Sequence, residues 1–239
     1  MTRHGARGPL IAIVTVAAIM AIVPSVDGRQ QSRMLRFCGR YPVAELFGPG
    51  RPTPRLPFRD EGATRPDFLA FRESLMRAIA RKDREAVLRV AHPDISISFD
   101  GGIAALKNLI ESPEQDFWGE FGRVLSMGGT FVADGFAAPY VYSTWPDEFD
   151  SYGCSAITAS AVRLRDRPDS GGAILAQLDF DIVEELHDGP DTPGWTRVRT
   201  VTGITGFVAS QFVRSPIAYR AGFVLDNGAW RLKWYAAGD

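Results

Sequence analysis

The stretch that decides the fold is AVRLRDRPDSGGAILAQLDFDIVEEL (residues 161–186), which resumes after a polar loop as WTRVRTVTGITGFVASQFVRS (residues 195–215). Short runs of alternating apolar and polar residues are separated here by clusters of Gly, Asp, Pro and Thr. Alternation with a period of two is typical of strands that bury one face, and the clusters are typical of turns. This part of the chain therefore predicts a small all-β module.

The order of these parts resembles a bacterial SH3-like domain. The chain has a Val-Arg-Leu-Arg segment, two further strands, a strand that begins with Trp, and a Gly-x-x-Gly-Phe-Val turn, where the family pattern has Leu-Asn-Val-Arg, the same order of strands, and Gly-x-x-Gly-Trp-Val. The residues that hold the pattern positions are Val162, Leu164, Arg165, Pro168, Leu178, Trp195, Val198, Gly203, Gly206, Phe207 and Val208. The resemblance implies a small SH3-like barrel over residues 155–214.

The N-terminal residues 1–28 predict a signal peptide rather than part of the fold. Arg3 and Arg7 form a positive region, Pro9–Val23 is apolar, and small residues follow up to the candidate cleavage sites after Ser25 and Gly28. The apolar run is shorter than the roughly twenty residues that a spanning helix needs. We therefore expect a periplasmic or secreted protein. The alternative is an uncleaved segment that anchors the chain in the membrane.

Cys38 and Cys154 are the two cysteines of the chain. In an exported protein they are a candidate disulfide, because the compartment is oxidising. The alternative is that each is a separately buried small apolar side chain.

Residues 29–60 are predicted to form an irregular arm before the first ordered element. Within the arm, the segment GPGRPTPRLP (48–57) is expected to be a stiff loop, and the alternative is that it binds a proline-recognising partner. Thr64 and Asp67 have the spacing of a capping box, with Pro66 in the first turn of a helix. The apolar face of this helix consists of Phe68, Phe71, Leu75 and Ile79. Asp83 is expected to cap a second, short helix.

Further elements follow from the same kind of pattern. Ile95–Phe99 alternates as a strand with Ile95, Ile97 and Phe99 on the buried face, and Ile103–Ile110 is a short apolar helix. Ser112 is expected to cap another helix, with Pro113 at its first position. Two strands are predicted between Thr130 and Trp145, which would place Tyr140 and Tyr142 on one face.

The C-terminal part predicts a hairpin. Tyr219–Leu225 and Trp230–Trp234 alternate on either side of Asp226-Asn227-Gly228, and Asn-Gly between alternating runs is a strong hairpin signal. Trp230, Leu232 and Trp234 would share one apolar face. We expect this hairpin to complete the sheet begun at Ile95–Phe99, with the SH3-like barrel inserted between them.

The segment Leu75–Phe99, LMRAIARKDREAVLRVAHPDISISF, and the hairpin YRAGFVLDNGAWRLKWYAAGD resemble a nuclear transport factor 2-like (cystatin-like) domain. The mature chain also looks similar to exported Gram-negative proteins that contain an SH3 domain. The resemblance implies an α+β fold with helices on a curved antiparallel sheet. Its α+β domain would comprise residues 61–154 with 215–239, and the SH3-like barrel would be inserted before the last hairpin.

Composition and motifs argue against several functions. Lys and Arg number 27 against 28 Asp and Glu, without basic clusters, so we do not expect a nucleic-acid partner. The mature chain has two distant histidines, His92 and His187, and we predict no metal site, no cofactor and no assigned catalytic residue. Residues of catalytic type in the α+β part are Asp94, Asp100, Tyr140, Tyr142 and Asp147, with His92 as a candidate base.

Binding is the function that the SH3-like resemblance favours. The candidate binding residues are Trp195, Arg165, Asp166 and Phe207, with the loops Asp166–Gly172 and His187–Gly194 flanking a groove. The loop residues His187, Asp188 and Asp191 form an acidic cluster that could attract a cation, although a solvated loop is the simpler interpretation. The alternative for Trp195 is that its ring packs inside the barrel.

We expect an exported, non-enzymatic envelope protein whose partner is peptidoglycan, through its cell-wall peptide, or another envelope protein. Two alternatives stay open. The α+β domain could hold a small-molecule or enzymatic pocket of the isomerase or hydrolase kind, or the SH3-like module could be structural only.

Overall fold

The computed structural model of the chain describes residues 36–38, 41–42, 53–133, 135–190 and 192–238, and its fold is α+β. The predicted signal peptide, most of the predicted arm, and Asp191 lie outside these ranges. Within them, no helix combines the length and the hydropathy needed to cross a membrane.

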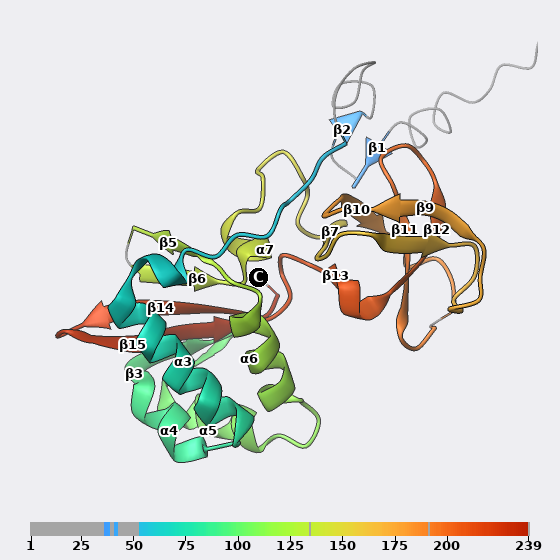
Figure 1. The fold of residues 1–239 in the computed structure, drawn as a ribbon. Helices are drawn as coiled ribbons and strands as arrows, with labels where there is room; N and C mark the ends of the chain where they lie inside the picture. The colour runs from blue at the N-terminus through green and yellow to red at the C-terminus, as the bar shows by residue number, and fades with distance from the viewer. Residues whose placement is uncertain (1–35, 39–40, 43–52, 134, 191, 239) are drawn as a thin grey trace, which may run out of the picture. The chain divides into compact units, whose positions relative to one another are not determined.

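The first sheet has six strands and is accompanied by most of the helices (Figure 1). Its strands, in spatial order, are β4 (Asp100–Gly101), β3 (Ala91–Ile97), β15 (Ala229–Ala236), β14 (Arg220–Asp226), β6 (Gly135–Ala138) and β5 (Thr130–Val132). The helices of this part are η1 (Gly62–Thr64), α3 (Pro66–Ala80), α4 (Arg84–Val90), α5 (Gly102–Glu111), α6 (Phe117–Ser126) and α7 (Tyr140–Ser143).

The predicted hairpin completes this sheet. β14 and β15 pair antiparallel, with Asp226 opposite Ala229 and positive φ angles at Asn227 and Gly228. β15 then pairs in parallel with β3, and β14 pairs antiparallel with β6. The prediction that the last hairpin joins the sheet begun near Ile95 is confirmed, and the hairpin supplies its two central strands.

A β-bulge changes which residues of the hairpin face the core. Phe223 lies opposite Leu232, but the next pair is Gly222 with Trp234, so Lys233 is the extra residue. The indole of Trp234 lies where a Cβ of Gly222 would be and contacts Tyr142, while Tyr235 is only 1% exposed in the core. The prediction that Trp234 shares the core face with Trp230 and Leu232 is therefore wrong.

The core of this part lies between the first sheet and helices α3 to α6. Phe68 of α3 is at its centre, with ring centroids 4.2 Å from Phe136 and 4.8 Å from Trp230. The buried strand residues that meet the helices are Ile95, Ile97, Phe136, Ala138, Ala221, Phe223, Trp230, Leu232 and Tyr235. Burying these aromatic and aliphatic side chains is the main stabilising contribution here.

The caps of two helices differ from the prediction. α3 begins at Pro66 as expected, but its N-cap is Arg65, and the Thr64 hydroxyl donates to Glu61 O instead of capping the helix. Ser112 follows the end of α5, and α6 is capped by Asp116, whose Oδ1 accepts the Gly119 N–H at 3.0 Å. α3 thus begins without a side-chain cap, whereas α6 has one, supplied by an Asp four residues after the predicted Ser112.

Three aromatic residues also lie elsewhere than predicted. Phe99 follows Ser98, which has a φ of 45°, so the strand ends before it and its ring is 88% exposed. Tyr140 and Tyr142 lie on the short helix α7 instead of a strand. Helical spacing directs Tyr140 into the interior and leaves Tyr142 39% exposed, so the two do not form the expected aromatic face.

The second sheet has seven strands and contains the stretch that opened the sequence analysis. Its order is β13 (Val213–Arg214), β7 (Cys154–Ile157), β10 (Ile182–Glu185), β11 (Trp195–Arg199), β12 (Thr205–Ala209), β8 (Val162–Arg165) and β9 (Ile174–Leu178). The short helix η2 (Ser210–Phe212) precedes β13. The buried core of this sheet consists of Ile157, Val162, Leu164, Leu178, Val183, Val198, Val208 and Val213.

A further two-stranded pair, β1 (Arg36–Phe37) with β2 (Tyr41–Pro42), lies in the N-terminal segment. Residues 54–56 run along the start of β10, where Leu56 N–H donates to Phe180 O at 2.8 Å and Ile182 N–H donates to Pro54 O at 3.0 Å. The described end of the predicted irregular arm is thus held by backbone hydrogen bonds.

Candidate functional site: a groove beside Trp195

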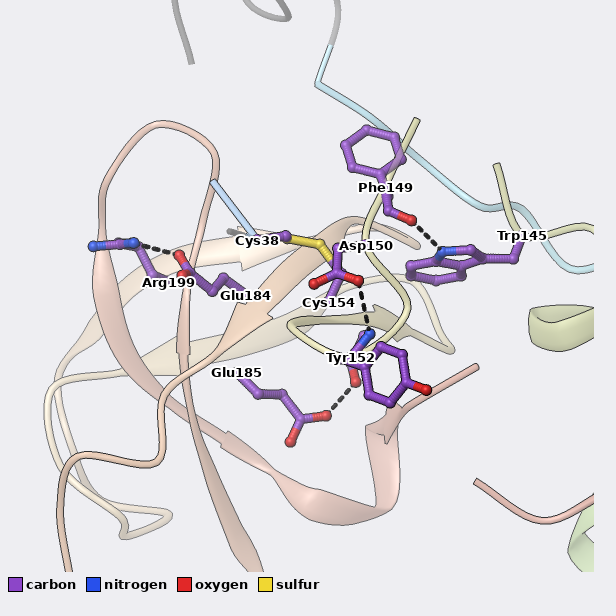
Figure 2. Close-up of a disulfide and its surroundings, with 10 residues drawn as sticks. Cys38, Trp145, Phe149, Asp150, Tyr152, Cys154, Glu184, Glu185 and Arg199 are labelled. Carbon is purple, nitrogen blue, oxygen red and sulfur yellow. Dashed lines mark hydrogen bonds and ion pairs between the residues drawn. A yellow bond between two sulfur atoms is a disulfide. The ribbon is translucent and has the colours of Figure 1, made fainter. Parts of the chain in front are cut away.

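A disulfide joins Cys38 to Cys154 at the start of β7, with a Cα–Cα separation of 5.3 Å (Figure 2). Both residues are 1% exposed. The rings of Phe37 and Phe149 meet edge to face beside the bond, and the Trp145 indole N–H donates to Phe149 O at 3.0 Å. The loop before β7 is therefore fixed to the N-terminal segment by both covalent and apolar contacts.

The apolar cluster around the disulfide draws on distant parts of the chain. Its buried members are Phe37, Cys38, Leu56, Tyr140, Val141, Phe149, Cys154, Ala156, Ile182 and Val201. Burial raises the pKa of the Tyr140 phenol to about 12, because the charged form loses its hydration. This cluster is a structural staple and leaves no reactive thiol among the described residues.

The second sheet carries a groove of about 470 Å³ on the face opposite its buried core. Its lining residues come from the end of β10, the following loop, β11 and β12: Glu185, Leu186, His187, Gly189, Pro190, Thr192, Trp195, Thr196, Arg197 and Phe207. Apolar rings and a proline alternate with hydroxyl and charged side chains. Such a mixture is typical of sites that bind an elongated polar ligand.

Strand register determines that Trp195 faces outward. Arg197 of β11 lies opposite Phe207 of β12, and Trp195 lies opposite Ala209. Residues two apart on a strand share a face, so Trp195, Arg197 and Phe207 lie together while Val198 and Val208 point into the core. Trp195 is half-buried and belongs to none of the core clusters, so the alternative that its ring packs inside the module is wrong.

The backbone around Trp195 is held on both sides. Its N–H donates to Thr192 O at 2.9 Å, and the Thr192 hydroxyl donates to Trp195 O at 3.2 Å. Among the described residues the indole N–H of Trp195 has no hydrogen-bond acceptor, although the rest of this residue is well fixed. An indole with a free donor, carried on a backbone held at this point, is suited to receiving a carbonyl or carboxylate oxygen.

The charged groups of the groove are arranged at its rim. Arg197 Nη1 lies 2.7 Å from Asp188 Oδ1, and the Asp188 side chain is 71% exposed. An exposed ion pair of this kind contributes little to stability, and its partners exchange readily with other ions. Glu185 accepts a hydrogen bond from Ser155, and Glu184 of the same strand pairs with Arg199 (Figure 2).

Two of the four predicted binding residues, Trp195 and Phe207, line this groove, and the other two do not. Arg165 is 8% exposed, and its Nη1 donates to Gly172 O at 2.6 Å, so it holds the loop after β8. Asp166 is exposed and begins that loop. Pro190 and Thr192 belong to the loop His187–Gly194, which was predicted to flank the groove, whereas the other predicted loop, Asp166–Gly172, does not line it. Arg197 was missed, although period-two alternation from Trp195 would have found it.

The residues of catalytic type named from the sequence do not converge. Asp100 is exposed on β4, Tyr140 is buried beside the disulfide, and Tyr142 contacts Trp234. His92 Nδ1 accepts the Asp94 N–H at 3.0 Å and lies 3.2 Å from Lys233 Nζ, away from any carboxylate pair. In the described ranges, no three His, Cys, Asp or Glu side chains are grouped as metal ligands would be.

Comparison with known proteins gives no further guide to the site. No protein-family model matches the chain, and no curated protein matches it in sequence.

Proposed function

We propose that this chain is an exported cell-envelope protein that binds the peptide part of peptidoglycan in the groove beside Trp195. In this proposal residues 155–214 form an SH3-like module, inserted into a nuclear transport factor 2-like domain made of residues 61–154 and 215–239. The seven-stranded sheet with its separate core and the hairpin that returns to the first sheet support this division.

The single observation that carries the proposal is the outward placement of Trp195. This large aromatic ring lines the groove together with Phe207, carries an indole N–H donor and is half-exposed, so a ligand in the groove can bury further apolar surface against it. The ring offers a flat face for the alkyl side chains of a short peptide. Its N–H can donate to a peptide carbonyl, and the hydroxyl oxygen of Thr192, whose proton is donated to Trp195 O, can still accept from a peptide N–H.

Charge at the rim favours a ligand with carboxylates over an uncharged one. Cell-wall peptides carry free carboxylates, and among the described residues the guanidinium of Arg197 pairs with Asp188, whose side chain is 71% exposed. A ligand carboxylate would exchange with Asp188 for the guanidinium at small cost, because the existing pair is solvent-exposed. The disulfide and the predicted signal peptide are consistent with the same compartment.

The test is co-sedimentation of the mature chain with purified peptidoglycan. We expect the protein to pellet with intact wall, to stay in solution with glycan strands stripped of peptide, and to lose at least tenfold affinity in Trp195→Ala and Phe207→Ala. Phe99→Ala removes an exposed aromatic ring from the other sheet and should bind as the unmodified protein does.

Two results would overturn the proposal. One is a folded Trp195→Ala variant that pellets as well as Phe99→Ala. The other is equal binding to stripped glycan, which would move recognition away from the peptide. Far-UV circular dichroism of each variant separates loss of binding from loss of fold.

A further inference from the structure

A second cleft, of about 560 Å³, lies in the α+β part, beside the start of α6. The hairpin contributes its open end here, where β14 begins and β15 ends. One wall is aromatic and apolar, and the other carries amide, carboxylate and guanidinium groups. The residues that line the cleft are Leu109, Glu114, Gln115, Asp116, Phe117, Gly119, Glu120, Arg123, Tyr219 and Tyr235. None of them lines the groove beside Trp195.

Tyr235 is the first residue that points to a ligand here. It is 1% exposed, and its hydroxyl has no hydrogen-bond partner. Its ring stacks on Tyr219 with centroids 4.8 Å apart and planes at 9°. Burial, reinforced by the charge of Glu120, raises the pKa of this phenol, so it is a neutral donor at physiological pH. A buried hydroxyl without an acceptor costs free energy that a ligand oxygen would recover.

Tyr219 has the opposite character, because its hydroxyl is already satisfied. It donates to Gln115 Oε1 at 2.5 Å, which leaves the amide NH₂ of Gln115 for another partner. The ring of Tyr219, whose other face stacks on Tyr235, offers the apolar face of the aromatic wall, and the buried ring of Phe117 meets Tyr235 edge to face at its base. The cleft therefore combines aromatic surface with one unused buried donor.

Arg123 is the second residue that points to a ligand. Its Nη2 donates to the carbonyl oxygens of Gln211 at 3.2 Å and Val213 at 3.1 Å, and no carboxylate among the described residues forms an ion pair with it. Burial and the nearby positive charge of Arg214 lower the pKa of this guanidinium, and Glu120 only partly offsets them. A half-buried guanidinium without its own anion attracts an incoming one.

The carboxylates of the cleft are largely occupied. Glu120 is paired with Arg214, whose side chain is 3% exposed and also donates to Tyr219 O. Asp116 caps α6 through the Gly119 N–H. Glu114 is exposed at the rim, where solvent and salt screen its charge.

From these contacts we propose that the cleft is a binding site for a small aromatic carboxylate. Its ring lies against Tyr219 and Phe117, its carboxylate pairs with Arg123, and a second oxygen acceptor takes the Tyr235 hydroxyl proton in a hydrogen bond. The site is independent of peptide binding at Trp195, because the two share no residue.

The experiment is a ligand-observed NMR titration of the full mature chain with 4-hydroxybenzoate, benzoate and benzamide at millimolar concentrations. We expect 4-hydroxybenzoate to bind most tightly and benzamide at least tenfold more weakly than benzoate. Arg123→Gln should remove the preference for the carboxylate, whereas Arg123→Lys keeps a cation and should retain part of it.

Tyr235→Phe tests the unused donor, and Tyr140→Phe is its matched control. Both tyrosines are 1% exposed with an unpartnered hydroxyl, but Tyr140 lies beside the disulfide and does not line this cleft. Tyr235→Phe should weaken 4-hydroxybenzoate binding about tenfold, a loss of about 1.4 kcal/mol, and Tyr140→Phe should leave it unchanged.

Three outcomes would overturn the proposal. They are the absence of binding by any of the three probes, equal affinity for benzoate and benzamide, and equal losses in Tyr235→Phe and Tyr140→Phe. Because Trp195→Ala should not affect the titration, failure of this site and failure of the peptide groove are distinguishable.

Discussion

Tyr235 of β15 lies in parallel register with Ile97 of β3, so the last strand of the chain pairs with the first long strand of the α+β part. Residues 154–214 lie between β6 and β14, which are themselves paired neighbours. The first sheet is therefore completed by β14 and β15, which follow the whole second sheet in sequence and are the two central strands of the first.

Truncation after Ser215 should therefore unfold the first sheet. It removes β14 and β15 and with them the buried side chains of Phe223, Trp230, Leu232 and Tyr235. Each such side chain contributes roughly 1.5–3 kcal/mol when buried, so the four together contribute about as much as the whole stability of an ordinary domain, roughly 5–15 kcal/mol. Hydrogen exchange should show loss of protection in α3 and β3, with protection retained in β11 and β12. A fragment of residues 64–145 that folds cooperatively alone would contradict this.

The sequence was sufficient to predict this pairing but not the face of each residue. Alternation and the Asn-Gly turn define the hairpin. Its two arms are too apolar to stand alone in water, so they are expected to join a larger sheet. The bulge at Lys233 has only one local signal, Gly222 in the opposite strand, where the Trp234 indole occupies the space of a Cβ. Because a shift of one residue exchanges the two faces, Tyr235 enters the core and the second cleft instead of Trp234.

The groove beside Trp195 was half predictable for a similar reason. Side chains alternate between the two faces along β11 and β12. The shared face of Trp195 and Arg197 follows from this alternation, and the pairing of the two strands adds Phe207. Arg165 is a member of the predicted set that turns inward, because its guanidinium satisfies the Gly172 carbonyl of its own loop. Loop conformation depends on such individual hydrogen bonds, which no periodicity encodes.

The disulfide should contribute strongly to stability. Cys38 and Cys154 are separated by 116 positions, and in the chain-entropy model closing so long a loop is worth roughly 4–5 kcal/mol. The double variant Cys38→Ser/Cys154→Ser should unfold at lower urea concentration than the oxidised protein. Its free energy of unfolding should be lower by up to that amount. Thiol labelling of the oxidised, denatured protein should detect no free cysteine, and detection of two would exclude the bond.

Trp195→Ala should cost little stability, although we expect it to lower the affinity for the proposed peptide ligand at least tenfold. Its ring is half-buried on the outer face, so truncation should cost less than about 2 kcal/mol. Leu164→Ala is the contrasting variant, because Leu164 is 0% exposed in the core of the same sheet and should cost about 2–5 kcal/mol. Urea unfolding followed by circular dichroism measures both. Equal costs would mean that Trp195 is a packing residue after all.

Stability should fall at alkaline pH because of Tyr140. Burial raises the pKa of its phenol to about 12 in the folded protein, while the unfolded chain titrates near 10. Between these values the unfolded state releases the proton first, so the free energy of unfolding decreases as pH rises. Two pH units correspond to about 2–3 kcal/mol at most. Below pH 10 this group has no pH-dependent effect.

Tyr140→Phe isolates that contribution. The variant keeps the buried ring and its edge-to-face contact with Phe58 but loses the unpartnered hydroxyl. At pH 8 it should be as stable as the unmodified protein or slightly more so, because no hydrogen bond is lost and a desolvated polar group is removed. Between pH 10 and 11 its unfolding free energy should decline less steeply than that of the unmodified protein, with Tyr235 left in place in both. Parallel decline of the two proteins in urea unfolding over this range would show that the Tyr140 hydroxyl is hydrated and titrates normally in the folded state.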